Sequence, residues 1–214
     1  MKRTIIHDFL VSTLVIALLI FLKIPYFNIL LALIIVLIYS HKKKGIKTEL
    51  GFSKPESWIK TIVTASLLAL GIILLSYFIL LPQIQILTGY QLDLGMFKQL
   101  GDNTSLLILS LVLGWVVGGF IEETIFRGFI LSKFINHLPN KIGTLLGIII
   151  SSAIFGYLHK YQGPSGQVLT GLIGTMFAII FVLNKRNIWL NIFTHGFVNT
   201  FGFILLYFNL INIS

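Results

Sequence analysis

The sequence contains no cysteine, few acidic residues and little charge of any kind. Its 214 residues include 16 basic and 7 acidic side chains, and charged residues make up 11% of the chain. A soluble domain of this size carries about 25% charged residues. The lack of cysteine excludes disulfides, thiolate metal ligands and a cysteine nucleophile. Any chemistry must therefore use other side chains, and the bilayer is the expected solvent.

Apolar residues take the place of the missing charge. They make up 56% of the chain, the mean hydropathy is +0.95, and they occur in long blocks of the kind that span membranes as helices. We predict an all-α fold, a polytopic transmembrane helix bundle with about seven spans that forms one integral membrane domain over residues 1–214. The predicted spans are residues 7–22, 24–40, 58–81, 106–131, 142–159, 167–183 and 188–211.

The first two predicted spans are short and are separated only by a few residues that include Lys23 and Pro25. They can form either a tight helical hairpin or one broken, tilted helix. No small-residue cleavage site follows the first apolar block, so we expect it to stay in the protein as a helix.

The basic residues are distributed unevenly between the two sides of the predicted bundle. With a cytoplasmic N-terminus, twelve lie on the cytoplasmic side and three on the other, as the positive-inside rule expects for an odd number of spans. We expect a multi-pass protein of the cell membrane with its C-terminus outside. Because the basic residues are scattered between apolar blocks, we expect no nucleic-acid partner. The twelve are Lys2, Arg3, Lys42, Lys43, Lys44, Lys47, Lys54, Lys60, Lys133, Lys141, Lys185 and Arg186; the three are Lys23, Lys98 and Lys160.

One long stretch outside the spans, residues 83–103, mixes apolar residues with Asp93, Lys98 and Asp102. This composition fits an interfacial amphipathic helix that covers one end of the bundle. It fits an ordinary loop equally well. Whether this stretch gates a site does not follow from the sequence.

Glu122 and Glu123 are the only acidic residues inside a predicted span. An ionisable group within the membrane costs several kcal/mol and is by default a hypothesis for a functional site. Glu123 precedes Arg127 by four residues, which favours an ion pair. Glu122 points about 100° away around the helix, so we expect it to face another neighbour and to be the reactive carboxylate. The other acids are Asp8, Glu49, Glu56, Asp93 and Asp102, at span ends or in loops.

Two of the five histidines lie in apolar surroundings. His159 follows Phe155 by four residues, and His195 precedes Asn199 by four, so each pair shares one helix face. At about 1.5 Å per residue, Glu122 and Asn199 each lie roughly 16 Å from the cytoplasmic helix ends, His195 roughly 10 Å and His159 roughly 25 Å. We therefore expect these groups to share one cavity. His7, His41 and His137 lie at span ends, where a half-polar ring is ordinary.

Two other interpretations of these buried polar groups stay open. Buried Asn, His and Glu also join membrane helices by hydrogen bonds, without chemistry. Chains of Glu and His build proton relays in transporters.

Three short strings resemble motifs of one family. Residues 122–128 read EETIFRG, residues 155–159 FGYLH and residues 195–199 HGFVN. They resemble, in order and spacing, the E-E-x-x-x-R, F-x-x-x-H and H-x-x-x-N motifs of the CPBP family. This family contains type II CAAX prenyl endopeptidases and bacteriocin-processing or self-immunity (Abi) proteins. The resemblance covers residues 106–203, the core helices, whereas the N-terminal spans in residues 1–105 carry no matching motif.

The resemblance implies an intramembrane endopeptidase, an enzyme that cuts peptide bonds near the membrane surface. It implies that Glu122 and His159 activate water, that His195 and Asn199 stabilise the oxyanion, and that Glu123 and Arg127, with Phe155, support the site. The family has been labelled metallopeptidase, and Glu122, His159 and His195 could ligate one zinc ion. The chain lacks the H-E-x-x-H helix of soluble zinc proteases, and we favour a mechanism without metal.

The implied substrates are membrane-associated, lipidated or small secreted peptides. CAAX-type cleavage requires prenylated partners, whereas bacteriocin or pheromone maturation and self-immunity require only a small peptide. Two other functions remain as alternatives: a non-catalytic regulator or immunity protein that binds a partner, and a small proton-coupled transporter. Oligomeric state does not follow from the sequence.

Overall fold

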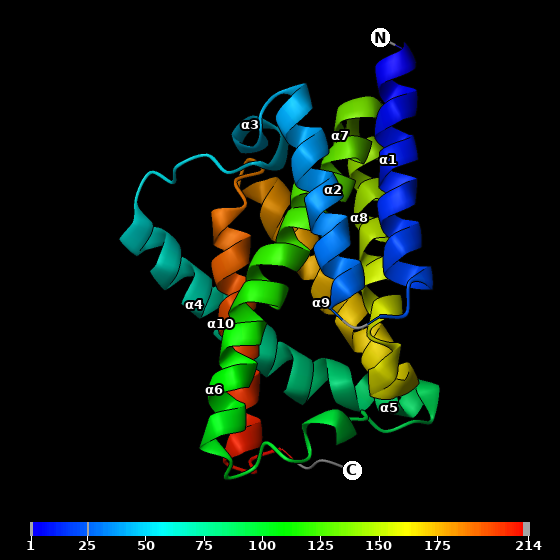
Figure 1. Cartoon of the computed structure of the whole chain (residues 1–214). Helices are drawn as coiled ribbons and strands as arrows, with labels where there is room; N and C mark the ends of the chain where they lie inside the picture. The colour runs from blue at the N-terminus through cyan, green and yellow to red at the C-terminus, as the bar shows by residue number, and fades with distance from the viewer. Residues whose placement is uncertain (1, 25, 212–214) are drawn as a thin grey trace.

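The computed structural model describes residues 2–24 and 26–211, which form helices and connections without any strand (Figure 1). The all-α prediction is confirmed. Three π-helical stretches (η1, η3 and η4) and two short 3₁₀ turns (η2 and η5) interrupt the α-helices. In chain order the helices are α1 (Lys2–Phe21), α2 (Phe27–Lys43), α3 (Ile46–Leu50), α4 (Trp58–Leu75), η1 (Ser76–Leu80), α5 (Leu81–Thr88), η2 (Gly95–Phe97), α6 (Thr104–Leu113), η3 (Gly114–Glu122), η4 (Thr124–Leu131), α7 (Ser132–His137), α8 (Asn140–Leu158), η5 (Lys160–Gln162), α9 (Gly163–Leu183) and α10 (Trp189–Tyr207).

Helices lie at all seven predicted spans. Within the described residues, six helical runs are long and apolar enough to cross a membrane, and the continuous runs Trp58–Thr88 and Thr104–His137 are longer than predicted. The seventh, α2, has 17 residues, the lower end of the spanning range. The chain starts α1 at one end of the bundle and finishes α10 at the other (Figure 1). An odd number of crossings fits this arrangement.

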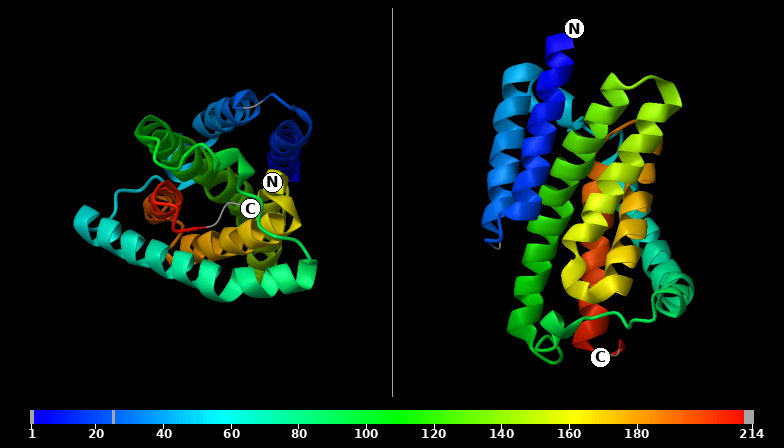
Figure 2. Two further views of the ribbon diagram at one scale, coloured as in Figure 1. Left: turned by 90° about the horizontal axis from the view of Figure 1, so that it is seen from below. Right: turned by 90° about the vertical axis from the view of Figure 1, so that its right-hand side faces the viewer.

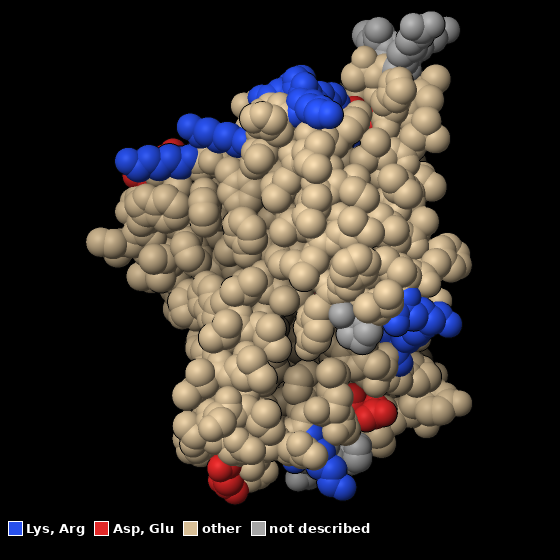
Figure 3. All heavy atoms as spheres, viewed as in Figure 1, with Lys and Arg blue, Asp and Glu red and all other residues tan. Residues whose placement is uncertain are grey.

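The outer surface of the bundle is apolar. Large hydrophobic side chains such as Phe21, Ile59 and Phe78 are more than three quarters exposed. The viewed face carries its charged groups toward the two ends, with a broad uncharged band between them (Figure 3). Soluble proteins do not expose apolar surface on this scale. The protein is a multi-pass membrane protein.

The N-terminal helices α1 and α2 lie side by side and antiparallel (Figures 1 and 2). Of the two arrangements that the sequence allows, the hairpin is the one that forms. Its turn contains Pro25, which lies outside the described residues. Val15 and Val36, one from each helix, are fully buried in a cluster with Phe129 of η4 and Phe155 of α8. The hairpin therefore packs directly against the helices that carry the predicted site.

The stretch 83–103 is not one amphipathic helix. The helix that begins at Trp58 continues through η1 and α5 to Thr88 and crosses the end of the bundle (Figures 1 and 2). Gly89, with a φ of 73°, then ends it in a left-handed conformation that glycine adopts without strain. The rest is irregular apart from η2, and it buries Leu92 and Leu100 in a cluster with Leu169 of α9 and Leu206 of α10.

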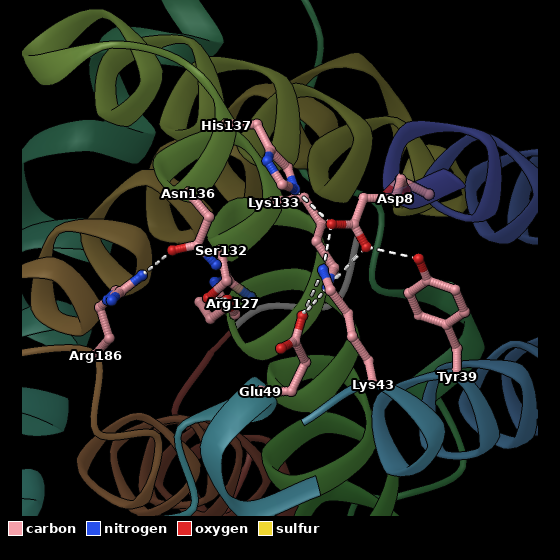
Figure 4. Close-up of polar contacts among 11 residues, drawn as sticks. Asp8, Tyr39, Lys43, Glu49, Arg127, Ser132, Lys133, Asn136, His137 and Arg186 are labelled. Carbon is pink, nitrogen blue, oxygen red and sulfur yellow. Dashed lines mark hydrogen bonds and ion pairs between the residues drawn. The ribbon is translucent and has the colours of Figure 1, made fainter. Parts of the chain in front are cut away.

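A network of buried charges lies at the end of the bundle where α1 begins (Figure 4). Asp8 of α1, fully buried, is paired with Lys43 of α2 and with Lys133 and His137 of α7. Tyr39 donates a 2.8 Å hydrogen bond to the same carboxylate. These contacts join the N-terminal hairpin to the end of the long helix that begins at Thr104.

The short helix α3 adds a second acid to this network. The carboxylate of Glu49 pairs with Lys133 and, at 3.3 Å, with Lys43. Burial raises the pKa of Glu49, but the hydrogen bonds and charges of the two lysines outweigh it, and the net shift is downward. Glu49 is therefore ionised at neutral pH. The five groups form one charge network: Asp8, Lys43, Glu49, Lys133 and His137.

We expect removal of Lys133 from this network to destabilise the fold. Lys133 is 1% exposed, and Lys133→Met leaves Asp8 and Glu49 buried with one cation fewer, which costs about 3–5 kcal/mol for a buried pair that loses a partner. Thermal unfolding of the purified protein in detergent measures this effect. Lys141→Met, at an exposed position, is the matched control. Equal unfolding temperatures for the two variants would show that the network contributes little.

Candidate active site

The predicted pair of Glu123 and Arg127 forms at the centre of the bundle. Both side chains are fully buried, and the guanidinium Nη1 donates a 2.9 Å hydrogen bond to Glu123 Oε1. Nη2 donates to the carbonyl oxygen of Gly174 in α9, also at 2.9 Å. The guanidinium lies 4.8 Å from the ring centre of Phe155 and 5.3 Å from that of Phe177. Arg127 is thus held by one carboxylate, one carbonyl and two aromatic rings.

Glu123 also orients His195 of α10. The ring nitrogen Nδ1 lies 2.8 Å from Glu123 Oε1, and the ring stacks on Phe177 with 4.7 Å between centroids. Because a carboxylate only accepts hydrogen bonds, Nδ1 carries a hydrogen. The other ring nitrogen, Nε2, therefore faces away from Glu123 and is available to a different group.

Glu122 lies beside that available nitrogen. Its Oε2 is 3.9 Å from His195 Nε2, and its side chain is 17% exposed, whereas that of Glu123 is not exposed at all. The two neighbouring glutamates thus have different environments, as the sequence predicts. Glu123 is neutralised by Arg127 inside the protein, and Glu122 faces His195 from a partly accessible position.

Asn199 and His195 converge on a glycine of the neighbouring helix. Asn199 Nδ2 donates a 2.9 Å hydrogen bond to the carbonyl oxygen of Gly114. A Cβ atom added at Gly118 would collide with that same amide nitrogen and lie 3.2 Å from His195 Nε2. The missing side chain of Gly118 therefore leaves space in front of two polar groups, one turn before Glu122.

Close packing of η3 on α10 makes this convergence possible. A Cβ at Gly119 would meet the backbone of α10 at 3.0 Å, and the indole of Trp115 lies over Gly196 of α10 and donates a 3.0 Å hydrogen bond to Thr200. The spacing of Gly114 and Gly118 in the sequence predicts close helix approach. The structure confirms the close approach and adds a role for Gly118 in shaping the site.

His159 contacts the predicted site residue Phe155 and is joined to the rest of the predicted site through it. It follows the last residue of α8, its Nδ1 lies 2.8 Å from the carbonyl oxygen of Phe155, and its ring is 5.6 Å from that of Tyr161. The Phe155 ring contacts both histidines, at 4.8 Å from His159 and 6.0 Å from His195. Among the contacts of the described residues, no hydrogen bond or ion pair joins His159 to Glu122.

The sequence-based interpretation missed Asn191. This fully buried amide donates to Glu123 Oε2 at 3.3 Å and to the carbonyl oxygen of Phe177 at 2.7 Å. It precedes His195 by four residues, just as Asn199 follows it by four. The repeated spacing of four places all three polar residues on one face of α10, and this pattern was available in the sequence.

Glu122, His159 and His195 are the candidate metal ligands that the sequence indicates. Within the described part of the chain, no three His, Cys, Asp or Glu side chains lie close enough together to hold an ion. In each histidine Nδ1 makes a hydrogen bond, with Glu123 in His195 and with a backbone carbonyl in His159, so Nε2 is the nitrogen that could ligate an ion.

The fold and these contacts define a class, a helical membrane protein with a carboxylate, histidine and amide site inside its bundle. Residues 104–201 match the model of the family described as type II CAAX prenyl endopeptidase Rce1-like. This region is a little less than half of the chain and contains all three motifs, so the resemblance that they carry is confirmed over these residues. No curated protein and no solved structure matches the chain.

A methyl group added at Gly118 tests the geometry of the site. Gly118→Ala must displace Asn199, His195 or the helix itself, and a displacement of about 1 Å at a reacting centre lowers a rate by about 100-fold. The measurement is the rate of peptide cleavage, with the unfolding temperature beside it. Gly202→Ala on α10, where an added Cβ meets nothing within 4 Å, should cleave at the wild-type rate. Full activity of Gly118→Ala would contradict the assigned site.

Proposed function

We propose that this protein hydrolyses a peptide bond in a membrane-associated, lipidated or small secreted peptide, with Glu122 as the group that activates water. One observation carries the proposal. Glu122, His195 and Asn199 converge on the space beside Gly118, where a scissile carbonyl group and a water molecule can sit together. The family-level assignment of residues 104–201 supports the same reaction class.

Glu122 is the general base in this mechanism. It takes a proton from a water molecule, and the water oxygen attacks the carbonyl carbon of the substrate. When the tetrahedral intermediate collapses, the C–N bond breaks and Glu122 returns the proton to the departing amine. A partly exposed carboxylate at the edge of a buried site suits this role, because substrate and water can reach it.

Asn199 and His195 are the oxyanion donors. The Asn199 amide has two N–H groups, and one is used by Gly114, which leaves the other for the developing negative charge. His195 donates from Nε2 when both ring nitrogens carry hydrogens. Glu123 faces the resulting positive charge through Nδ1, much as a buried carboxylate orients and stabilises the histidine in serine proteases.

His159 completes the proposed site as a second acceptor for the attacking water. The carbonyl of Phe155 fixes a hydrogen on Nδ1, so Nε2 is the nitrogen that can accept. Glu123, Arg127 and Phe155 are positioning residues. Arg127 fixes Glu123, Glu123 fixes His195, and the Phe155 ring lies against both histidines.

Two rival functions make different predictions. A regulator that only binds a partner uses the buried polar residues as helix contacts, and a transporter uses them to move protons or solutes. A regulator does not need Glu122 as a base, whereas a proton-coupled transporter needs it to take up and release protons but cleaves no peptide. The difference in environment between Glu122 and Glu123 argues against the regulator, because a purely structural acid would be paired as Glu123 is.

Glu122→Gln should abolish cleavage without unfolding the protein. The amide keeps the shape of the side chain but cannot take a proton, and loss of a general base lowers a rate by about 100- to 10,000-fold. A mixed library of membrane-associated, prenylated and secreted peptides, analysed by mass spectrometry, supplies the readout and the cleavage motif. Glu56→Gln, at an exposed position, is the control and should cleave normally. Equal cleavage by both variants would favour the structural interpretation of Glu122.

Removal of metal should leave cleavage unchanged. The proposed mechanism uses only side chains of this chain, and the described residues do not gather a metal ligand set. The purified protein is dialysed against a strong chelator, its metal content is measured, and cleavage is compared before and after dialysis. Activity that is lost on dialysis and restored by zinc would overturn the metal-free mechanism.

A further inference from the structure

A pocket separate from the candidate active site opens at the end of the bundle that carries the charge network. It has a volume of about 490 Å³. One wall is the connection 51–57 with the first turns of α4, and the other is the turn between α9 and α10. Two hydrogen bonds join the walls, from the Ile188 backbone N–H to the carbonyl oxygen of Gly51 at 3.0 Å and from Asn187 Nδ2 to that of Ser53 at 2.8 Å. The pocket is thus a fixed feature of the fold.

The lining of this pocket is strongly basic. It contains Lys54, Lys60, Lys185 and Arg186 against a single acid, Glu56. None of the ion pairs between described side chains involves any of the four cations. The Arg186 guanidinium donates a 2.6 Å hydrogen bond to Asn136 (Figure 4), whereas the three lysines are exposed.

The backbone of the α9–α10 turn brings two of the cations to the pocket. Lys185 and Arg186 have φ values of 52° and 62°. These lie in the left-handed region, which residues other than glycine and asparagine rarely adopt. Gly51, with a φ of 80°, allows the opposite wall to approach this turn so closely that a Cβ there would collide with the Arg186 carbonyl oxygen. Two neighbouring strained residues indicate that the rest of the fold fixes this turn.

The position of the pocket points to the membrane surface. Trp58 and Trp189, whose ring centroids are 5.2 Å apart, begin α4 and α10 at this level, and tryptophan is typical of the membrane interface. Apolar side chains directly beside the pocket are exposed: Ile59 is 78% and Leu183 77% exposed. A ligand here meets cations at one end and an apolar surface at the other.

We infer that this pocket binds the phosphate group of an anionic phospholipid headgroup. The lysines and hydroxyls such as that of Thr64 face the phosphate, and the acyl chains lie along the bare apolar surface of α4 and α9. Basic pockets at the ends of membrane helices recognise anionic lipid in this way. A soluble phosphate would use the same cations but would gain nothing from the apolar surface, so the lipid is the favoured source.

The test measures lipid retention by the full-length protein purified in detergent. The protein is mixed with equal amounts of phosphatidylglycerol and phosphatidylcholine, and bound lipid is counted by native mass spectrometry. Wild type should retain the anionic lipid selectively. Replacement of two pocket lysines, in Lys60→Gln with Lys185→Gln, should weaken that retention about tenfold, since each lysine near anionic lipid contributes roughly 1 kcal/mol, less screening by salt.

A matched pair of substitutions controls for net charge. Lys42→Gln with Lys44→Gln removes the same charge from exposed positions of the predicted cytoplasmic surface, outside the pocket, and should retain lipid as wild type does. Equal retention by the pocket variant and this control, or equal retention of the two lipids by wild type, would overturn the inference. Peptide cleavage is not the readout, so this test and the proposed function succeed or fail separately.

A second arm separates lipid from free phosphate. Inorganic phosphate is titrated against the unfolding temperature of wild type and of the pocket variant. A stabilisation that depends on the pocket lysines, together with no preference for phosphatidylglycerol, would overturn the lipid assignment and show a site for soluble phosphate. Selective lipid retention with no such stabilisation would support the lipid.

Discussion

The site depends on one buried carboxylate, that of Glu123. It accepts hydrogen bonds from Arg127 on its own helix and from Asn191 and His195 on α10, and through Arg127 it is linked to the carbonyl of Gly174 on α9. A charge at such a depth is tolerated only when it is paired and fully hydrogen-bonded. The same contacts join three helices. The ion pair and hydrogen bonds that neutralise Glu123 therefore also fix the orientation of His195.

Much of this arrangement could be predicted from the sequence. It depends on the spacing of residues along single helices and on the scarcity of acidic residues within the spans. The long apolar blocks predict the helices, and the spacing of four between Glu123 and Arg127 predicts their ion pair. The scarcity of acids within spans singles out Glu122. These features depend on one helix at a time, and the structure agrees with them.

What could not be predicted depends on contacts between distant segments. The charge network joins Asp8 to Lys133, which are far apart in the sequence. In the sequence each of them is only a charged residue at the end of a predicted span, where charge is ordinary. The depth estimate gives distances along helix axes but not around them. It places His159 among the candidate site residues, but it cannot show that the ring of His159 lies against Phe155 and Tyr161. Residues 83–103 fit two structures equally well until the packing of Leu92 and Leu100 is known.

The burial of Asp8 has a consequence for how the chain enters the membrane. Asp8 leaves the ribosome long before its partners, because Lys43 follows 35 residues later and Lys133 and His137 much later still. Until Lys43 arrives, the first helix carries an uncompensated acid near one end, which is costly to bury in lipid. Full pairing of Asp8 therefore requires first α2, which carries Lys43, and then α7, which carries Lys133 and His137. The buried acid of the N-terminal hairpin is thus only partly paired until α7, the end of the long helix that carries Glu122 and Glu123, packs against it.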